Sequence, residues 1–278
     1  MTRHEDAGEL LATAIEAAQA AGRLVHGRIG DDLKIRHKEL GVQNLVTEMD
    51  HASEALIKEI IGTRHPGAIF LAEESGGDQT LEELTWVVDP IDGTVNYAHG
   101  IPIYCISIAA VRENEPVVGV IYNPNTEELF TAVRGGGAFL NGVPMRVSTI
   151  DNLRRAVLVT GFPYNVAENP YGCVDSFVDF MMLGVPVRRL GSAALDLAYT
   201  AAGRFEAFWE VSLNHWDVAA GILMVIEAGG RVTTYAEACS DERDEACPIV
   251  TDRMLATNGV IHRTIETVLM RSGTVTLD

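Results

Sequence analysis

One short stretch, Trp86 to Asn96, constrains the fold more than any other, and it reads WVVDPIDGTVN. Its apolar start is typical of a buried strand, which we expect to stop at Asp89-Pro90 because proline removes a ladder donor and keeps the preceding residue extended. Gly93 permits a tight turn, and Thr94 is a good residue type for opening the next helix. The stretch therefore predicts carboxylates at a strand end beside outward-pointing amides, where hard cations and an anion can meet.

The composition limits the size and the partners of the protein. With 278 residues, 47% of them hydrophobic, and 26 glycines, the chain is long enough for one large globular αβ domain or for two domains that share an interface. Its net charge of −18 argues against direct nucleic-acid binding and against an anionic membrane surface. A small anionic substrate would need metal ions to offset the local repulsion.

Cysteine usage and the N-terminus favour a reduced, cytoplasmic protein. The four cysteines, at positions 105, 173, 239 and 247, form no CxxC pair, and Cys105 lies in an apolar run where a buried free thiol is expected. The first residues are charged and contain no apolar signal core. No run approaches the roughly 20 apolar residues that span a bilayer, so we expect no membrane association.

The chain has two differently patterned parts. The first part predicts helices near 7–26 and 52–61, a polar loop at 29–42, a strand at 68–72, an antiparallel sheet from 101–111, 117–122 and 129–133, and a hairpin at Asn141-Gly142. The second part alternates strands at 156–160, 185–190, 205–210 and 231–234 with helices at 174–183, 192–202 and 218–227, before an acidic surface loop at 236–247. We therefore expect a mixed α/β protein in which subregions 1–150 and 151–278 form one compact unit.

Four acidic residues lie at the ends of predicted elements: Glu73, Asp89, Asp92 and Asp217. Carboxylate oxygens suit Mg²⁺, and two ions that share a carboxylate form a clamp for in-line attack on phosphorus. Taken alone, Glu73 is also explained as a solvated loop acid, and Asp217 as the cap of the apolar helix that follows it. The acids on both sides of Pro90 are harder to explain in that way, since neither a hairpin nor a cap needs two acids there.

Competing motifs fail on their own chemistry. Haloacid-dehalogenase-like phosphatases carry DxDGT with a nucleophilic first aspartate, but the residue two positions before Asp92 is Pro90. That spacing favours metal ligation and direct attack by water over a phospho-aspartyl intermediate. An EF-hand is excluded because its alternating acids and closing glutamate are absent from this stretch. The glycines at 135–137 are not followed by the Lys-Ser/Thr of a phosphate-binding loop, so a glycine-rich hairpin is favoured there. His215 has no second histidine at ligand spacing, so a packing role is favoured.

The chain resembles the inositol monophosphatase family, which belongs to the superfamily of lithium-sensitive, magnesium-dependent phosphatases. DPIDGTVN at 89–96 matches the family's first motif, and WDVAAG at 216–221 matches its second. Supporting matches are NLVTEMD at 44–50, EES at 73–75, GGGAFLNG at 135–142 and GSAA at 191–194, so the resemblance spans roughly residues 7–270. It implies a layered αβαβα sandwich of the inositol monophosphatase and fructose-1,6-bisphosphatase type, and a homodimer.

The resemblance also implies roles for particular residues. Two or three Mg²⁺ ions are expected. One would bind Glu73, Asp89 and the carbonyl of Ile91, and a second would bind Asp89, Asp92 and Asp217. Glu73 would also help to bind a weaker third ion, and for this reason it is assigned a catalytic role as well. The amides of Gly93 and Thr94 would bind the phosphate. The Thr94 hydroxyl, paired with Asp50, would orient and deprotonate the metal-bound water. From the residues alone, Thr47-x-x-Asp50 resembles a capping box, and without the family resemblance that interpretation of Asp50 is favoured.

Substrate-side residues follow from the same resemblance. Glu210 matches a position whose carboxylate contacts inositol hydroxyls, Ser192 and Ala193 belong to a loop that lines the same pocket, and Arg188 lies near it. Without the resemblance, Glu210 is an ordinary strand-end acid, and Arg188 is either structural or faces an anionic substrate. Val95 stands where relatives acting on 3′-phosphoadenosine 5′-phosphate, and many histidinol-phosphate phosphatases, often have lysine.

The sequence thus predicts hydrolysis of a small polyol phosphate monoester, with inositol 1-phosphate as the leading substrate. Fructose-1,6-bisphosphatase and histidinol-phosphate phosphatase activities are the enzymatic alternatives. From a different class, some bacterial relatives are protein-binding regulators of the transcription machinery, and that alternative stays open here.

Overall fold

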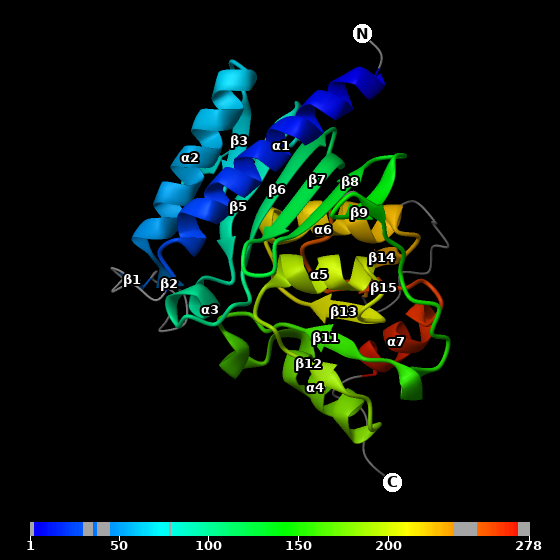
Figure 1. Ribbon diagram of the computed structural model, residues 1–278. Coiled ribbons are helices and arrows are strands. Elements are labelled where there is room, and N and C mark those ends of the chain that lie inside the picture. Colours follow the sequence, from blue (N-terminus) through cyan, green and yellow to red (C-terminus); the bar gives the residue numbers. More distant parts are fainter. Residues whose placement is uncertain (1–2, 30–35, 38–44, 78, 236–248, 272–278) are drawn as a thin grey trace.

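Helices and sheets alternate in layers in the computed structural model, which describes residues 3–29, 36–37, 45–77, 79–235 and 249–271. Helices α1 (Arg3–His26) and α2 (Glu48–Arg64) cover the outer face of the first sheet, and α5 (Ala193–Ala201) and α6 (His215–Glu227) fill the space between the two sheets (Figure 1). Helices α4 (Cys173–Met182) and α7 (His262–Leu269) cover the far side of the second sheet. This arrangement confirms the expected αβαβα sandwich.

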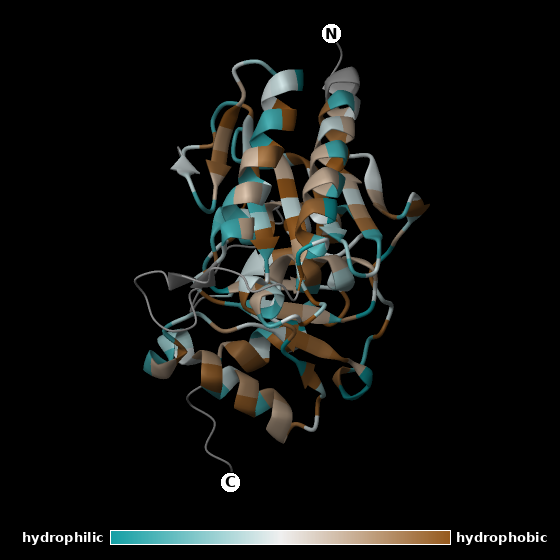
Figure 2. Cartoon of the chain, turned by 60° about the vertical axis from the view of Figure 1, so that its left-hand side comes forward, coloured by the Kyte–Doolittle hydropathy of each residue, from teal (hydrophilic) through white to brown (hydrophobic). Residues whose placement is uncertain are grey.

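The outer helices form because one face of each is apolar. In α1 the side chains of Leu10, Ala14, Ala17 and Ala21, at helical spacing, are fully buried against the sheet. Figure 2 shows the resulting pattern: hydrophobic residues predominate in the strands, whereas the outer helices mix hydrophilic and hydrophobic residues. The helix expected at 52–61 begins earlier, at Glu48, because Thr47 caps it.

The first sheet has eight strands in the order β10-β9-β8-β7-β6-β5-β3-β4. Their bounds are β3 Ile69–Ala72, β4 Gly76–Gly77, β5 Thr85–Asp92, β6 Cys105–Arg112, β7 Glu115–Asn123, β8 Glu128–Val133, β9 Gly137–Leu140 and β10 Val143–Pro144. The antiparallel sheet expected from 101–111, 117–122 and 129–133 is confirmed by β6, β7 and β8, whereas β3 and β5, which join the same sheet, are parallel to each other. The reason is that β4 runs back along β3 before β5 starts. The expected hairpin turn is confirmed, because Asn141 and Gly142 both have positive φ, at 50° and 77°.

The central strand does not stop at Asp89, as the sequence had suggested, but continues to Asp92. Its register against β6 shifts on the way: Asp89 pairs with Ser107 and Asp92 pairs with Cys105, so β5 carries an extra residue. Such a bulge accepts Pro90, because a bulged residue is not needed as a ladder donor. The bulge turns both aspartates toward the same end of the sheet.

The second sheet has five strands in the order β12-β11-β13-β15-β14. Their bounds are β11 Leu158–Thr160, β12 Val187–Arg188, β13 Ala207–Glu210, β14 Arg231–Thr234 and β15 Met254–Thr257. Sequence reasoning predicted a longer strand at 185–190 and did not predict β15 or α7. The described part also contains a two-stranded pair, β1 Arg36–His37 with β2 Leu45–Val46, and short 3₁₀ helices at Leu153–Arg155, Val166–Glu168 and Pro170–Gly172. Most of the expected loop at 29–42 and the acidic segment 236–247 lie outside the described residues.

Helix α6 lies against the first sheet at very short range. A Cβ at Gly119 of β7 would be 2.9 Å from the carbonyl oxygen of Ala220, so glycine is required for this approach. One hydrophobic cluster contains Leu71 and Phe130 of the first sheet, Phe208 of the second sheet and Leu223 of α6. This core holds the N-terminus of α6 beside the end of β5; the division of the chain near residue 150 remains a prediction.

Candidate active site

The bulged end of β5 presents two buried aspartates, of which Asp89 is 2% and Asp92 is 8% exposed. Asp89 Oδ1 accepts the Ile91 amide hydrogen at 3.0 Å. Asp92 Oδ2 accepts the Ser192 hydroxyl at 2.6 Å and the Ala194 amide at 2.8 Å. The first turn of α5 therefore holds Asp92 from a point far along the chain, and the hydroxyl of Ser192 is engaged with a carboxylate.

Gly93 turns the chain from β5 into the short helix α3 (Thr94–Ala98). Its φ is +95°, and a Cβ there would lie 3.0 Å from the Ile103 carbonyl oxygen, so both the conformation and the space require glycine. The Thr94 hydroxyl lies 3.1 Å from Asp50 Oδ1 and 3.0 Å from the Ile91 carbonyl oxygen. Its single proton is thus shared between a carboxylate and a carbonyl.

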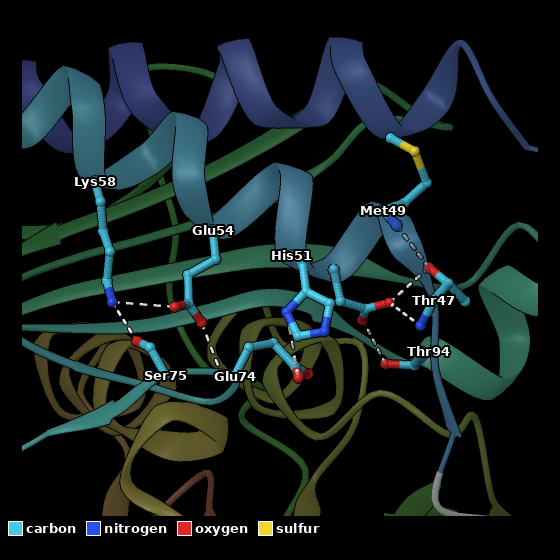
Figure 3. Close-up of polar contacts among 9 residues, drawn as sticks. Thr47, Met49, His51, Glu54, Lys58, Glu74, Ser75 and Thr94 are labelled. Carbon is cyan, nitrogen blue, oxygen red and sulfur yellow. Dashed lines mark hydrogen bonds and ion pairs between the residues drawn. The ribbon is translucent and has the colours of Figure 1, made fainter. Parts of the chain in front are cut away.

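Asp50 reaches Thr94 because α2 begins with a capping box (Figure 3). The Thr47 amide and hydroxyl donate to Asp50 Oδ2 at 2.7 and 2.6 Å, and the Met49 amide donates to the Thr47 hydroxyl at 3.1 Å. Burial raises the pKa of Asp50, although hydrogen bonds from Thr47 and Thr94 oppose that rise. The capping role that the sequence favoured and a contact with Thr94 therefore exist together, one on each carboxylate oxygen.

Asp217 has the same local geometry at the start of α6. The cap residue is Asn214, whose backbone amide donates to Oδ2 of Asp217, the third helical residue, at 2.7 Å. The sequence had placed the start of this helix at residue 218 with Asp217 as its cap; the helix starts at His215, and Asp217 takes part in the capping box from inside the first turn. Asp217 also lines the cavity at the end of β5.

A cavity of about 560 Å³ brings these elements together. Its acidic lining residues are Glu73, Asp89, Asp92, Asp196, Glu210 and Asp217, and Ile91, Gly93, Thr94, Ser192 and Ala193 also line it. Burial raises the pKa of Asp89 well above its usual range, and the nearby charges of Glu73, Asp92 and Asp217 add to the rise. Burial and repulsion from Asp92 and Glu73 likewise raise the pKa of Asp217 to about 8, against opposing hydrogen bonds from Asn214. The acids are close enough to destabilise one another's charges.

The donor set fits a hard divalent cation. Carboxylate and carbonyl oxygens are what Mg²⁺ and Ca²⁺ prefer, and a positive charge would relieve the repulsion that the pKa shifts record. Within the described residues, no three His, Cys, Asp or Glu side chains are already placed so that they could hold a metal ion. The acids instead surround an open cavity, in which water and substrate oxygens would complete the coordination of an ion.

The organic half of a substrate would meet a second group of residues. Burial, and repulsion from Asp217, raise the pKa of Glu210 to about 8, while Arg189 opposes that rise. Ser192 and Ala193 line the cavity as expected, whereas Arg188 is exposed, donates to the Val187 carbonyl and is not among the lining residues. Among the residues that the structure describes, its neighbour Arg189 is the one lysine or arginine in the cavity lining.

Sequence reasoning missed Arg189 and Asp196. Asp196 lies on α5, is 1% exposed, and its Oδ1 has no hydrogen-bond partner among the described residues. Burial raises the pKa of Asp196 well above its usual range, and Glu210 adds to the rise. An available signal was the polarity of Asp196 inside an otherwise apolar helix, AALDLAYTA.

Comparisons with known proteins show the family of the chain. A profile of the inositol monophosphatase family matches residues 6–271. An inositol-1-monophosphatase of Synechocystis is 43% identical over 260 residues, which cover 93% of this chain and 88% of the relative. The solved inositol monophosphatase of Anabaena superposes with a TM-score of 0.80 at 40% identity and covers 96% of this chain and 97% of its own. A Pseudomonas aeruginosa protein named Nus factor SuhB is 40% identical over 81% of this chain and 85% of its own.

Fold, sequence and relatives together define the class of the protein as a phosphoric monoester hydrolase of the αβαβα type. Within that class, the chain belongs to the inositol monophosphatase family, as the sequence motifs had indicated. Members of this family are metal-dependent. In the described part of the chain, no helix is long and apolar enough to cross a membrane.

Proposed function

We propose that this phosphatase hydrolyses the phosphate monoester of a small polyol in a Mg²⁺-dependent reaction, by direct attack of water, with inositol 1-phosphate as the leading substrate. The observation that carries the proposal is the Thr94 hydroxyl, which lies between Asp50 and Ile91 at the edge of the acid-lined cavity. A cavity of about 560 Å³ suits a ligand of this size.

The acids of the cavity provide the metal sites in this proposal. Glu73, Asp89 and the Ile91 carbonyl would hold one Mg²⁺, and Asp89, Asp92 and Asp217 a second, with Glu73 helping a weaker third. Bound Mg²⁺ would supply the positive charge that stabilises a transferring phosphoryl group and activates the attacking water. The hydrogen bonds that hold Asp89 and Asp92 keep these carboxylates oriented before the substrate arrives.

The remaining steps belong to the chain itself. The amides of Gly93 and Thr94, at the start of α3, would donate to a phosphoryl oxygen. Thr94 would accept a hydrogen from the attacking water while its own proton moves toward Asp50 Oδ1. Asp50 suits that role because burial already raises its pKa, which makes the carboxylate a better proton acceptor. Glu210, Ser192 and Ala193 would contact the leaving group. Val95 occupies the position at which relatives acting on 3′-phosphoadenosine 5′-phosphate often have lysine, which disfavours a nucleotide substrate.

A phosphate-release panel tests the substrate. The purified protein is assayed with Mg²⁺, and with EDTA as the control, on inositol 1-phosphate, fructose 1,6-bisphosphate, histidinol phosphate and 3′-phosphoadenosine 5′-phosphate. We expect the highest kcat/KM for inositol 1-phosphate and no turnover in EDTA. A higher kcat/KM for another substrate would overturn the substrate proposal, and turnover in EDTA would overturn the metal proposal.

A second role is favoured by the relatives named Nus factor SuhB, which are 39–40% identical to this chain. We propose as the alternative that the protein binds the transcription machinery through a protein surface, since a charge of −18 opposes direct contact with RNA. Pull-down of RNA polymerase subunits from lysate, compared between wild type and Asp92→Asn, separates the roles: binding that survives in the inactive variant supports the regulator.

The expected homodimer, lithium sensitivity and cytoplasmic location remain predictions, and light scattering tests the dimer directly.

A further inference from the structure

One face of α2 contacts Glu74 and Ser75, in the turn that follows β3 (Figure 3). Glu73 is the first residue of the same turn. Glu54 and Lys58 lie on this face one helical turn apart and reach residues 74 and 75 of that turn. His51, three residues and so nearly one turn before Glu54, lies 3.9 Å from the Glu74 carboxylate. The helix that presents Asp50 to Thr94 therefore also holds the segment next to Glu73.

Glu54 is at the centre of these contacts. Only 4% of the residue is exposed, its Oε2 accepts the Glu74 amide hydrogen at 2.9 Å, and its Oε1 lies 3.0 Å from Lys58 Nζ. Lys58 in turn donates to the Ser75 hydroxyl. Burial alone would raise the pKa of Glu54, but hydrogen bonds from Ser75, the Glu74 amide and Lys58 outweigh it and lower the pKa. The buried side chain is therefore an anion, and the hydrogen bonds and the ion pair described here join it to this turn and to Lys58.

The turn is also held by its backbone. The Glu73 amide donates to the Val88 carbonyl of β5 at 3.2 Å, and β3 pairs with β4 through Ala72 with Gly76 and Leu71 with Gly77. Strand β4 consists of Gly76 and Gly77 only, both exposed and both with positive φ. Glycines lose more conformational entropy on folding than other residues, so a side chain that fixes the backbone before them contributes to the order of the turn.

We propose that Glu54 is a positioning residue for Glu73: by accepting the Glu74 amide hydrogen it fixes the backbone from which Glu73 enters the cavity. This inference rests on the proposed metal role of Glu73. Groups that orient metal ligands change metal affinity by about 10–100-fold when they are removed. Glu54 touches neither substrate nor cavity, so its effect belongs to metal affinity and not to the chemical step.

Calorimetric titration with Mg²⁺ alone tests the proposal, with phosphate-release kinetics as a second readout. For Glu54→Ala we expect an Mg²⁺ Kd raised about 10-fold and a kcat within about 3-fold of wild type at saturating Mg²⁺. Glu54→Gln keeps an acceptor for the Glu74 amide and should recover most of the affinity. Glu59→Gln makes the same isosteric change at an exposed position of α2 and should match wild type.

A double-mutant cycle shows whether Glu54 acts through Glu73. In a Glu73→Gln background, Glu54→Ala should leave the remaining Mg²⁺ binding unchanged, because the ligand it positions is already absent. Equal fold-changes in both backgrounds, or a melting temperature lowered with an unchanged Kd, would overturn the proposal in favour of a purely structural role. If Glu54→Ala does not fold, the same cycle with Glu54→Met decides, because methionine keeps the side-chain volume but removes the acceptor for the Glu74 amide: the proposal requires that the Mg²⁺ Kd rises when Glu73 is present and stays unchanged in Glu73→Gln. Wild-type protein that neither binds Mg²⁺ nor releases phosphate would refute the proposed function itself.

Discussion

The N-termini of α2 and α6 carry the same capping box, yet they meet the cavity in different ways. In each, the third helical residue is an aspartate whose Oδ2 accepts the amide hydrogen of the cap residue at 2.7 Å, from Thr47 to Asp50 and from Asn214 to Asp217. Asp50 is fully buried behind Thr94 and bonds its hydroxyl. Asp217 is itself a lining residue, beside the charges of Asp92 and Glu73.

The difference shows that capping and chemistry are not competing explanations for a carboxylate. One oxygen is enough to satisfy the helix end, and the tertiary structure decides what the other oxygen meets. Behind Thr94 it can act only through a hydroxyl, as a proton acceptor would. On the cavity wall it can hold a cation directly. The two aspartates should therefore respond differently to the same substitution.

Asp217→Asn should have the largest effect. The amide keeps an oxygen for the Asn214 amide hydrogen, so the helix cap survives, but the charge beside Asp92 is lost. We expect kcat/KM to fall by at least about 10³-fold and calorimetric Mg²⁺ binding to weaken strongly, with a far-UV circular dichroism spectrum like that of wild type. Asp92→Asn should behave alike, and near-normal activity in either variant would remove that residue from the site.

Asp50→Asn should have a smaller effect of a different kind. The amide again keeps the cap, but a proton acceptor for Thr94 is lost, so we expect kcat to fall roughly 10²-fold while the Mg²⁺ Kd stays within about 3-fold of wild type. Steady-state kinetics and calorimetry on the same sample give both numbers. A Kd that rises as much as it does for Asp217→Asn would mean that the two aspartates do not differ in function.

The pH dependence of stability should distinguish the Asp217 side of the comparison. With a folded pKa of about 8 against an ordinary value of 3.8, Asp217 binds more protons in the folded than in the unfolded metal-free protein throughout that window. Its contribution to stability therefore falls as the pH rises from 4 to 8, and bound Mg²⁺ should offset the loss. At one fixed Mg²⁺ concentration, about 100 times the Kd at pH 8, we expect the melting temperature to rise by roughly 5 °C at pH 8 and clearly less at pH 5.5, where protonated carboxyls weaken Mg²⁺ binding.

Differential scanning fluorimetry at the two pH values measures this shift, and Asp217→Asn is the matched control because it cannot titrate. An increase of equal size at both pH values in wild type would contradict the prediction.

The caps themselves should matter least. Thr47→Ala and Asn214→Ala each remove a cap side chain, and each should lower the free energy of unfolding by about 1 kcal/mol. Thr47→Ser keeps the hydroxyl that donates to Asp50 and should match wild type. Urea denaturation measures all three variants. A loss of activity in Thr47→Ala as large as that in Asp50→Asn would show that the cap, and not the carboxylate, governs Thr94.

Local patterns predicted much of the fold and of the site. The strand, acids, glycine and threonine at 86–94 occur as expected, because a turn glycine and a helix-opening threonine depend on near neighbours. The bulge at Pro90 could not be predicted in the same way, since it exists only through the register against β6. Strand β15 was missed because it lies between β13 and β14 in the second sheet and is defined by pairing with both, and not by its own four residues.

The sequence by itself determined the family, the layered fold, the acids at element ends and both capping boxes, because these depend on spacing and on local hydrogen bonds. Only the tertiary structure decided that α5 holds Asp92, that α2 holds the turn after Glu73, and that Arg189 rather than Arg188 lines the cavity. The physical reason is that the direction in which a side chain points depends on its position along the backbone. Arg188 ends β12 and Arg189 follows it, and successive side chains of a strand point to opposite faces, so a difference of one position decides between cavity and solvent.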